Sequence, residues 1–192
     1  MNSFDDSLFD GYSSLFLKYL ESSKTYGEYG VGKSTKYVAK NSRAKIISVD
    51  SDLKWIDKTR SEIGQIKLKL KSIDLHYVNL GPVGEWGRPL SYDNIDNADE
   101  YANYIWSQKM VPDFVLIDGR FRVYCFLTSV QKAPKNTVIF FDDYVERKHY
   151  HIVEKFIKPY ELNARQAIFK VDKIQNRELI QSYINHFKFV FD

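Results

Sequence analysis

The chain has 192 residues, 44% of them hydrophobic, which is enough to bury one core. We expect a single domain over residues 1–192, either whole or one domain of a longer protein. Its 28 basic and 25 acidic side chains are mixed and give a net charge of +3, so no basic stripe favours a nucleic-acid partner. A single cysteine, Cys125, excludes an internal disulfide and agrees with a reducing, cytoplasmic location. The apolar runs are too short to span a membrane, and a homo-oligomer is compatible with this composition.

Predicted helices and strands alternate along the chain. After a leading helix within residues 1–23, at about 5–21, we expect helices at 34–40, 53–63, 98–109, 123–132, 149–157 and 177–186. We expect a strand ending at Glu28 and further strands at 44–49, 74–79, 114–117, 138–141, 166–171 and 187–191. The Lys-Leu alternation at 67–71 predicts a solvated helix end or edge. The order predicts an α/β class, doubly wound and Rossmann-like, with a mostly parallel sheet, helices on both faces and an antiparallel strand near the C-terminus.

The stretch at residues 27–35, GEYGVGKST, fits two different ligand-binding loops. Residues 27–34 match G-x-x-x-x-G-K-[ST], a phosphate loop in which Lys33 would contact the terminal phosphates and Ser34 a magnesium ion. Residues 28–32 instead read E-x-G-x-G, an acidic residue and two glycines at a strand-to-helix turn, as in folds that bind a dinucleotide or S-adenosylmethionine. Both interpretations predict that the loop opens a helix and binds a ligand there.

The neighbouring residues favour S-adenosylmethionine. Residues 22–26, SSKTY, are poor at filling the buried strand that a phosphate loop needs before it. Asp50 follows Gly30 by 20 residues at the end of the next predicted strand, where an acidic side chain can accept hydrogen bonds from both ribose hydroxyls of an adenosine. Thr35 stands where a nicotinamide-dinucleotide site has its third glycine. A kinase or NTPase that uses residues 27–34 as a phosphate loop remains the alternative.

We expect the cofactor-binding residues to lie where the parallel strands end. In an open parallel sheet, ligands bind beyond the carboxyl ends of the strands, where the strand order reverses. The backbone N–H groups near Gly30 and Gly32 would hold the cofactor carboxylate at the start of the helix. The predicted cofactor-binding residues are Glu28, Gly30, Gly32, Ser34, Asp50 and Asp118.

Five segments spread over residues 24–158 carry further motifs: GEYGVGKST, IISVDSD, NLGPVGEWGRP, VLIDGRFRVYCFL and VIFFDDYVERKHYHIVEKF. Together they resemble the successive motifs of class I S-adenosylmethionine-dependent methyltransferases, particularly small bacterial and viral members found with polysaccharide genes. Asp118 and the D-D-Y at 142–144 are also similar to metal-dependent sugar O-methyltransferases, although DGRFR at 118–122 departs from them. The resemblance implies an O-methyltransferase that acts on a hydroxyl of a carbohydrate, either a glycan or a nucleotide sugar.

Three aspartates follow the two most apolar predicted strands. Asp118, Asp142 and Asp143 would make an oxygen-rich metal site suited to Mg²⁺ or Mn²⁺. A divalent cation bound to the acceptor hydroxyl would lower its pKa and orient its attack. The structural alternative is that Asp118 caps a turn before Gly119 and that the other two aspartates only end a strand.

Several other side chains are candidates for roles in the same place. Asp118 and His149 are the predicted catalytic bases, His149 because it follows the D-D-Y closely and an imidazole can accept a proton. Arg120 and Arg122 are expected to form ion pairs or to contact the cofactor carboxylate or an anionic sugar. Trp86, in a loop rich in Gly and Pro, is expected to pack within that loop or to lie against a sugar ring or the adenine.

Overall fold

The computed structural model describes residues 5–66, 72–172 and 176–192, and one seven-stranded sheet runs through them. The strands are β1 (Thr25–Tyr29), β2 (Lys45–Asp50), β3 (Ile73–Tyr77), β4 (Phe114–Ile117), β5 (Val138–Phe141), β6 (Glu161–Asn163) and β7 (Gln166–Lys170). Their order is β3-β2-β1-β4-β5-β7-β6. The pairs among β1 to β5 are parallel, and β7 is antiparallel to both of its neighbours. The structure confirms the predicted doubly wound sheet and its antiparallel strand near the C-terminus.

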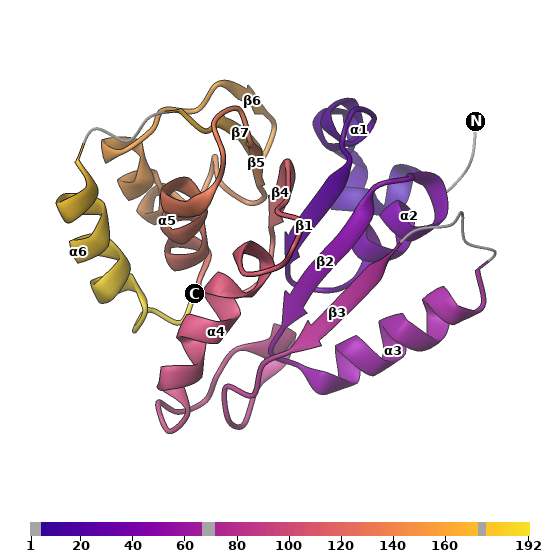
Figure 1. Ribbon diagram of the computed structural model, residues 1–192, viewed down its shortest axis with the longest axis horizontal. Coiled ribbons are helices and arrows are strands. Elements are labelled where there is room, and N and C mark those ends of the chain that lie inside the picture. Colours follow the sequence, from indigo (N-terminus) through magenta and orange to yellow (C-terminus); the bar gives the residue numbers. More distant parts are fainter. Residues whose placement is uncertain (1–4, 67–71, 173–175) are drawn as a thin grey trace.

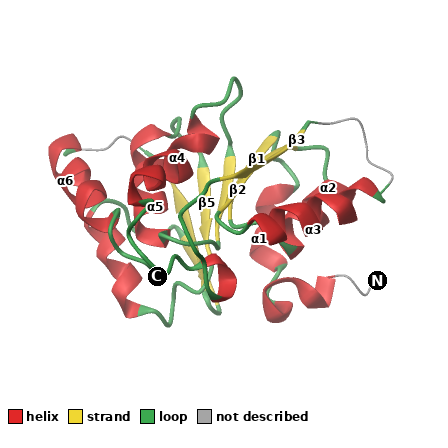
Figure 2. Cartoon of the chain, turned by 90° about the horizontal axis from the view of Figure 1, so that it is seen from below, coloured by secondary structure: helices red, strands yellow, loops and turns green. Residues whose placement is uncertain are grey.

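Helices cover both faces of this sheet. They are α1 (Ser14–Leu20), α2 (Lys33–Asn41), α3 (Leu53–Gly64), α4 (Ala98–Asn103), α5 (Arg122–Lys132) and α6 (Arg177–Phe187). Short 3-10 helices lie at Asp5–Gly11, Glu85–Gly87, Ile95–Asn97, Tyr104–Trp106 and Lys148–Lys155. Figures 1 and 2 show α1, α2 and α3 on one side of the sheet and α4, α5 and α6 on the other. No helix in these ranges is long and apolar enough to cross a membrane.

The core consists of two apolar clusters, one on each face of the sheet. β4 contributes to both, because successive strand residues point to opposite faces. Phe114 and Leu116 lie in the cluster under α1 and α2, whereas Val115 and Ile117 lie in the cluster under α4 and α5. All four are at most 1% exposed. Burial on both faces explains why this strand is an uninterrupted apolar run in the sequence.

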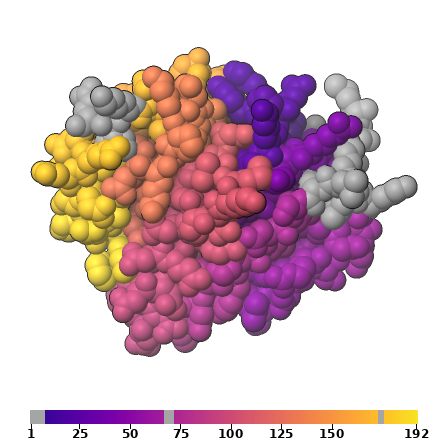
Figure 3. All heavy atoms as spheres, viewed as in Figure 1, coloured from indigo at the N-terminus to yellow at the C-terminus, as the bar shows by residue number. Residues whose placement is uncertain are grey.

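The N-terminal segment contacts both α1 and β5. Phe9 packs against Phe16 of α1 and Phe140 of β5, with ring centroids 5.2 Å apart in both pairs. Phe9, Asp10 and Gly11 all have positive φ, so the predicted leading helix is broken between its 3-10 part and α1. In Figure 3 the indigo N-terminal residues lie against orange residues of the second half of the chain.

One sequence prediction near the C-terminus was wrong, and one short strand was missed. The predicted strand at 187–191 is absent: Phe187 ends α6 and stacks on Tyr183, and Phe191 packs on Tyr92 and Phe121. Phe187 thus packs within α6 and Phe191 packs on distant rings, so neither joins the sheet. The short edge strand β6 was not predicted.

Two predicted helices form in shortened or tighter form. The helix expected at 98–109 is α4 followed by one 3-10 turn, and the helix expected at 149–157 is the 3-10 helix Lys148–Lys155. The prediction at 67–71 lies outside the described residues.

Gly27 of β1 lies in a tightly packed part of the sheet. An added Cβ at Gly27 would lie 2.5 Å from Pro112 Cγ and 3.1 Å from Ile105 Cδ1. We predict that Gly27→Ala lowers the free energy of unfolding by about 1–3 kcal/mol, because β1 or its neighbours must shift. Gly64→Ala, at the end of α3 with no atom within 4 Å of the new Cβ, is the matched control. Urea unfolding of both variants measures this, and an unchanged midpoint for Gly27→Ala would contradict it.

Candidate functional site

A cavity of about 530 Å³ opens where four parallel strands end. Gly30 follows β1, Asp50 ends β2, Asp118 follows β4 and Asp142 follows β5, and all four line it. The chain order reverses between β1 and β4, which is where open α/β sheets bind their ligands. The cavity therefore lies where the sequence placed the site.

Two glycines bring the turns after β1 and β4 into contact. A Cβ at Gly30 would lie 2.8 Å from Gly119 Cα, and one at Gly119 would lie 2.7 Å from Gly30 N. Gly30 also has φ +96°, which residues with a side chain rarely adopt. Glycine at both positions is therefore a requirement of the backbone at the floor of the cavity.

Glu28 is completely buried and accepts four hydrogen bonds from hydroxyl groups. Tyr26 donates at 2.9 Å, Thr35 at 2.6 Å and Ser48 at 2.9 Å, and Ser34 is the fourth donor. These donors come from β1, β2 and the first turn of α2. Glu28 does not line the cavity. The structure thus places this predicted cofactor-binding residue beneath the loop, where it fixes the loop to the sheet.

The same contacts do not fit the phosphate-loop alternative. Gly27, its first glycine, lies inside β1 and not in a loop. The hydroxyl of Ser34, its predicted magnesium ligand, donates to Glu28 instead. Residues 27–34 therefore match the G-x-x-x-x-G-K-S pattern, but they do not form the loop that wraps phosphates in such proteins.

The N–H groups of the turn are also occupied. Gly30 N donates to Val49 O at 2.9 Å, Val31 N to Asp50 Oδ2 at 2.7 Å, and Gly32 N to Thr35 Oγ1 at 2.9 Å. The sequence predicted that the N–H groups near Gly30 and Gly32 would hold a ligand carboxylate. The structure instead uses them within the protein, so a bound carboxylate needs other donors.

Asp50 is held rigidly at the edge of the cavity. Its carboxylate accepts from Val31 N and from Asp52 N, at 2.7 and 2.8 Å, and it is 9% exposed. Burial raises the pKa of Asp50 to about 6, against the effect of these backbone donors. This side chain is therefore oriented before any ligand arrives.

Two tryptophans stand beside Asp50. Trp55 of α3 and Trp86 both line the cavity, with indole planes 14° apart and ring centroids 6.5 Å apart. Trp86 lies at the tip of a turn closed by the Val83–Pro89 bridge, and Ser51 Oγ donates to Gly87 O of that turn at 2.8 Å. Trp86 is 73% exposed, and its φ of +57° is a strained backbone conformation for a large residue. The loop thus presents an aromatic surface to the cavity.

The three predicted metal ligands do converge. One carboxylate oxygen each of Asp118, Asp142 and Asp143 can be chosen so that all lie within 4.8 Å of one another. Asp118 is the most accessible of them, with a side chain 36% exposed. Desolvation of this partly buried side chain, together with the charges of Asp142 and Asp143 and against that of Arg122, raises the pKa of Asp118 to about 7.

Three arginines neutralise this acidic cluster. Arg122 lies 3.1 Å from Asp118 and 3.3 Å from Asp143. Arg165 pairs with Asp142 and Asp143, and Arg147 with Asp143 at 2.7 Å. The lone pairs a cation would use are therefore shared with guanidinium groups, and a metal ion would have to displace them. Guanidinium groups occupy the cluster as folded, and the metal site stays a prediction.

The remaining predicted residues divide between cavity and surface. Arg122 forms the expected ion pairs, whereas Arg120 lines the cavity with a main-chain partner. His149 is exposed, packs against the ring of Tyr150 and does not line the cavity, so the structure does not bring this candidate base to the site.

Sequence reasoning missed Arg147, Arg165, Trp55 and Asp10, which all line the cavity. Arg165 follows β6 and Asp10 lies in the N-terminal segment, yet the two form an ion pair. The sequence held a weak signal for Arg147 alone, because it lies four residues after Asp143.

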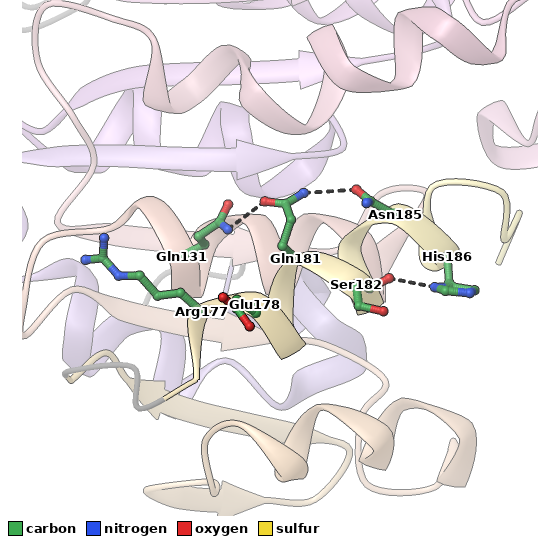
Figure 4. Close-up of a pocket in the computed structure, with 7 residues that line it drawn as sticks. All are labelled: Gln131, Arg177, Glu178, Gln181, Ser182, Asn185 and His186. Atoms are coloured by element: carbon green, nitrogen blue, oxygen red, sulfur yellow. Dashed lines mark hydrogen bonds between the residues drawn. The ribbon is translucent and has the colours of Figure 1, made fainter.

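A second hollow, on the outer side of α5 and α6, is shallow and lined by Gln131, Arg177, Glu178, Gln181, Ser182, Asn185 and His186. Figure 4 shows its amides hydrogen-bonded to one another, from Gln131 to Gln181 and from Gln181 to Asn185. It lies away from the strand ends and contains neither the glycine turn nor the acidic cluster, so it is not the candidate site.

Comparison with known proteins supports the fold. No protein-family model and no curated protein matches the chain. Among solved structures, a methyltransferase-like protein from Silicibacter pomeroyi is 25% identical, with a TM-score of 0.82 over 98% of this chain and 95% of that one.

Two more distant structures were determined with S-adenosyl-L-homocysteine. The N-methyltransferase NodS from Bradyrhizobium japonicum has a TM-score of 0.57 at 10% identity, covering 90% of this chain and 89% of that one. An RNA methyltransferase from Salinibacter ruber has a TM-score of 0.51 at 11% identity, covering 89% and 92%. The chain therefore has the class I methyltransferase fold.

Proposed function

We propose that this protein is an S-adenosylmethionine-dependent methyltransferase. The observation that carries the proposal is the cavity at the reversal of strand order, where the glycine turn after β1, Asp50 and Asp118 all meet. The methyltransferase-like structure at 25% identity supports it through the fold.

Asp50 and the two tryptophans supply contacts for the adenosine part of the donor. A buried carboxylate at the end of β2 can accept hydrogen bonds from both ribose hydroxyls. Trp55 and Trp86 lie beside it in the cavity wall and offer an aromatic surface to the adenine. The methionine part then extends towards Gly30 and Asp118.

Asp118 is the candidate general base. Methyl transfer to a hydroxyl forms the bond from oxygen to methyl carbon, breaks the bond from that carbon to sulfur and releases the hydroxyl proton. Asp118 lines the cavity, and a pKa near 7 suits proton uptake at neutral pH. Arg122 donates to one carboxylate oxygen at 3.1 Å and keeps the side chain oriented.

The acceptor that we propose is a hydroxyl of a carbohydrate. Sugar hydroxyls are bound by paired polar groups, and the cavity is lined by the Asp and Arg side chains after β4 and β5. This acceptor class rests on the side chains of the cavity.

Donor binding provides the first test. We predict that S-adenosylhomocysteine quenches tryptophan fluorescence, and that Asp50→Asn weakens its binding by about 10- to 100-fold, because a charged acceptor of ribose hydrogen bonds is lost. Asp57→Asn, on the exposed side of α3, is the control and should bind like the wild type. Binding of ATP with magnesium, in the absence of binding to S-adenosylhomocysteine, would contradict the proposal.

Proton transfer provides the second test. Because a base must be ionised, we predict that kcat/KM for an acceptor nucleotide sugar or oligosaccharide rises with pH through about 7, the raised pKa of Asp118. Asp118→Asn should lower the rate by about 100-fold or more. We expect full activity in EDTA, since arginines already neutralise the cluster. Loss of activity that Mn²⁺ restores would instead establish the metal role predicted from the sequence.

Loop attachment provides a test that needs no ligand. Burial raises the pKa of Glu28 to about 7 from an ordinary value of 4.5, so the folded protein binds this proton more tightly than the unfolded chain. The stabilising contribution is complete below pH 4.5 and is lost as the pH rises to about 7. The free energy of unfolding of Glu28→Gln, relative to the wild type, should therefore rise by about 2 to 3 kcal/mol across that range. A pH-independent difference in urea unfolding would contradict this.

A further inference from the structure

Five cationic side chains line the cavity, and three of them are paired with aspartates. Arg122, Arg147 and Arg165 belong to the acidic cluster. The other two are Lys33 and Arg120, and within the described ranges neither has an aspartate or glutamate side chain at ion-pair distance. Lys33 is exposed at the start of α2, whereas Arg120 is held in the turn after β4.

The guanidinium group of Arg120 is hydrogen-bonded at Nη1, whereas no described residue accepts from its Nε. Its Nη1 donates to the main-chain oxygen of Asp192 at 2.7 Å. Its Nε is shielded from water and has no acceptor among the residues that the structure describes, which is costly for a charged group. Nε and Nη2 form the edge of a guanidinium that binds a carboxylate with two parallel hydrogen bonds. One end of the group is thus anchored, and Nε is a donor that no described residue satisfies.

The C-terminal residues 188–192 set the position of Arg120. The Asp192 side chain accepts from Arg122 N at 2.9 Å, at the start of α5. Phe191 stacks on Tyr92 with centroids 4.3 Å apart and meets Phe121 edge-on at 5.4 Å. Figure 1 shows this end of the chain close to α4 and α5. These contacts hold the main-chain oxygen that orients the Arg120 guanidinium.

We propose that Arg120 binds the α-carboxylate of the methyl donor. The inference rests on the proposed function. It assigns the carboxylate of the donor to an arginine side chain and not to the glycine turn. The N–H groups of Gly30, Val31 and Gly32 are occupied within the protein, so the turn leaves the carboxylate without those donors. Arg120 follows Gly119, which touches Gly30, and so lies next to the place where the methionine part of the donor ends.

Two ligands that differ in the amino-acid group test this directly. S-adenosylhomocysteine carries the carboxylate, and 5′-methylthioadenosine lacks the whole amino-acid part. Isothermal titration calorimetry measures both affinities. Arg120→Met should weaken the binding of S-adenosylhomocysteine by about 10- to 100-fold and change the affinity for 5′-methylthioadenosine by less than about twofold. Arg120→Lys, which keeps the charge without the paired donors, should weaken the binding of S-adenosylhomocysteine by an intermediate factor. Unchanged binding of 5′-methylthioadenosine also shows that each variant is folded.

Two matched variants complete the design. Arg88→Met, at an exposed arginine outside the cavity, should bind both ligands like the wild type. If Arg120→Met binds both ligands normally, or if Lys33→Met alone removes the preference for S-adenosylhomocysteine, the proposal is overturned while the methyltransferase assignment stands. A wild-type protein that binds neither ligand would overturn both.

Discussion

The site depends on one buried carboxylate. Glu28 joins β1, β2 and the first turn of α2 through four hydroxyl groups, and no cation lies among these partners. A charged group in this position is expensive to bury, and the raised pKa of Glu28 reflects that cost. The four hydrogen bonds to Glu28 fix the position of the turn at residues 30–32 relative to the sheet. The cavity exists because this turn and the one containing Gly119 can touch without side chains between them.

Charge divides the cavity into two regions. Asp50 and the tryptophans form a region where a single carboxylate is fixed by backbone N–H groups. Beyond β4 and β5, aspartates and arginines are paired with one another, so that region is nearly neutral and rich in hydrogen-bonding groups. Arg120 lies between the two regions in the turn after β4. A zwitterionic donor bound across this boundary would meet groups of both signs without a metal ion.

The sequence predicts the parts of the fold that local patterns determine. The apolar runs of β4 and β5 and the aspartates that follow them identify the central strands and the edge where ligands bind. β1 was harder, because its residues are polar: Glu28 is acceptable inside the sheet only because its hydroxyl partners arrive from other elements. Similarly, the pairing of Arg165 with Asp142 joins residues whose contact depends on the antiparallel β7. Phe191 suggested a strand but packs on rings distant in sequence.

A crystal structure of the protein with S-adenosylhomocysteine would show whether Asp50 and the turn after β1 form the donor site. We predict ribose hydroxyls at hydrogen-bonding distance from Asp50, with Glu28 still surrounded by its hydroxyl donors and out of contact with the ligand. Density for the ligand in the hollow between α5 and α6, or a ribose turned away from Asp50, would contradict it.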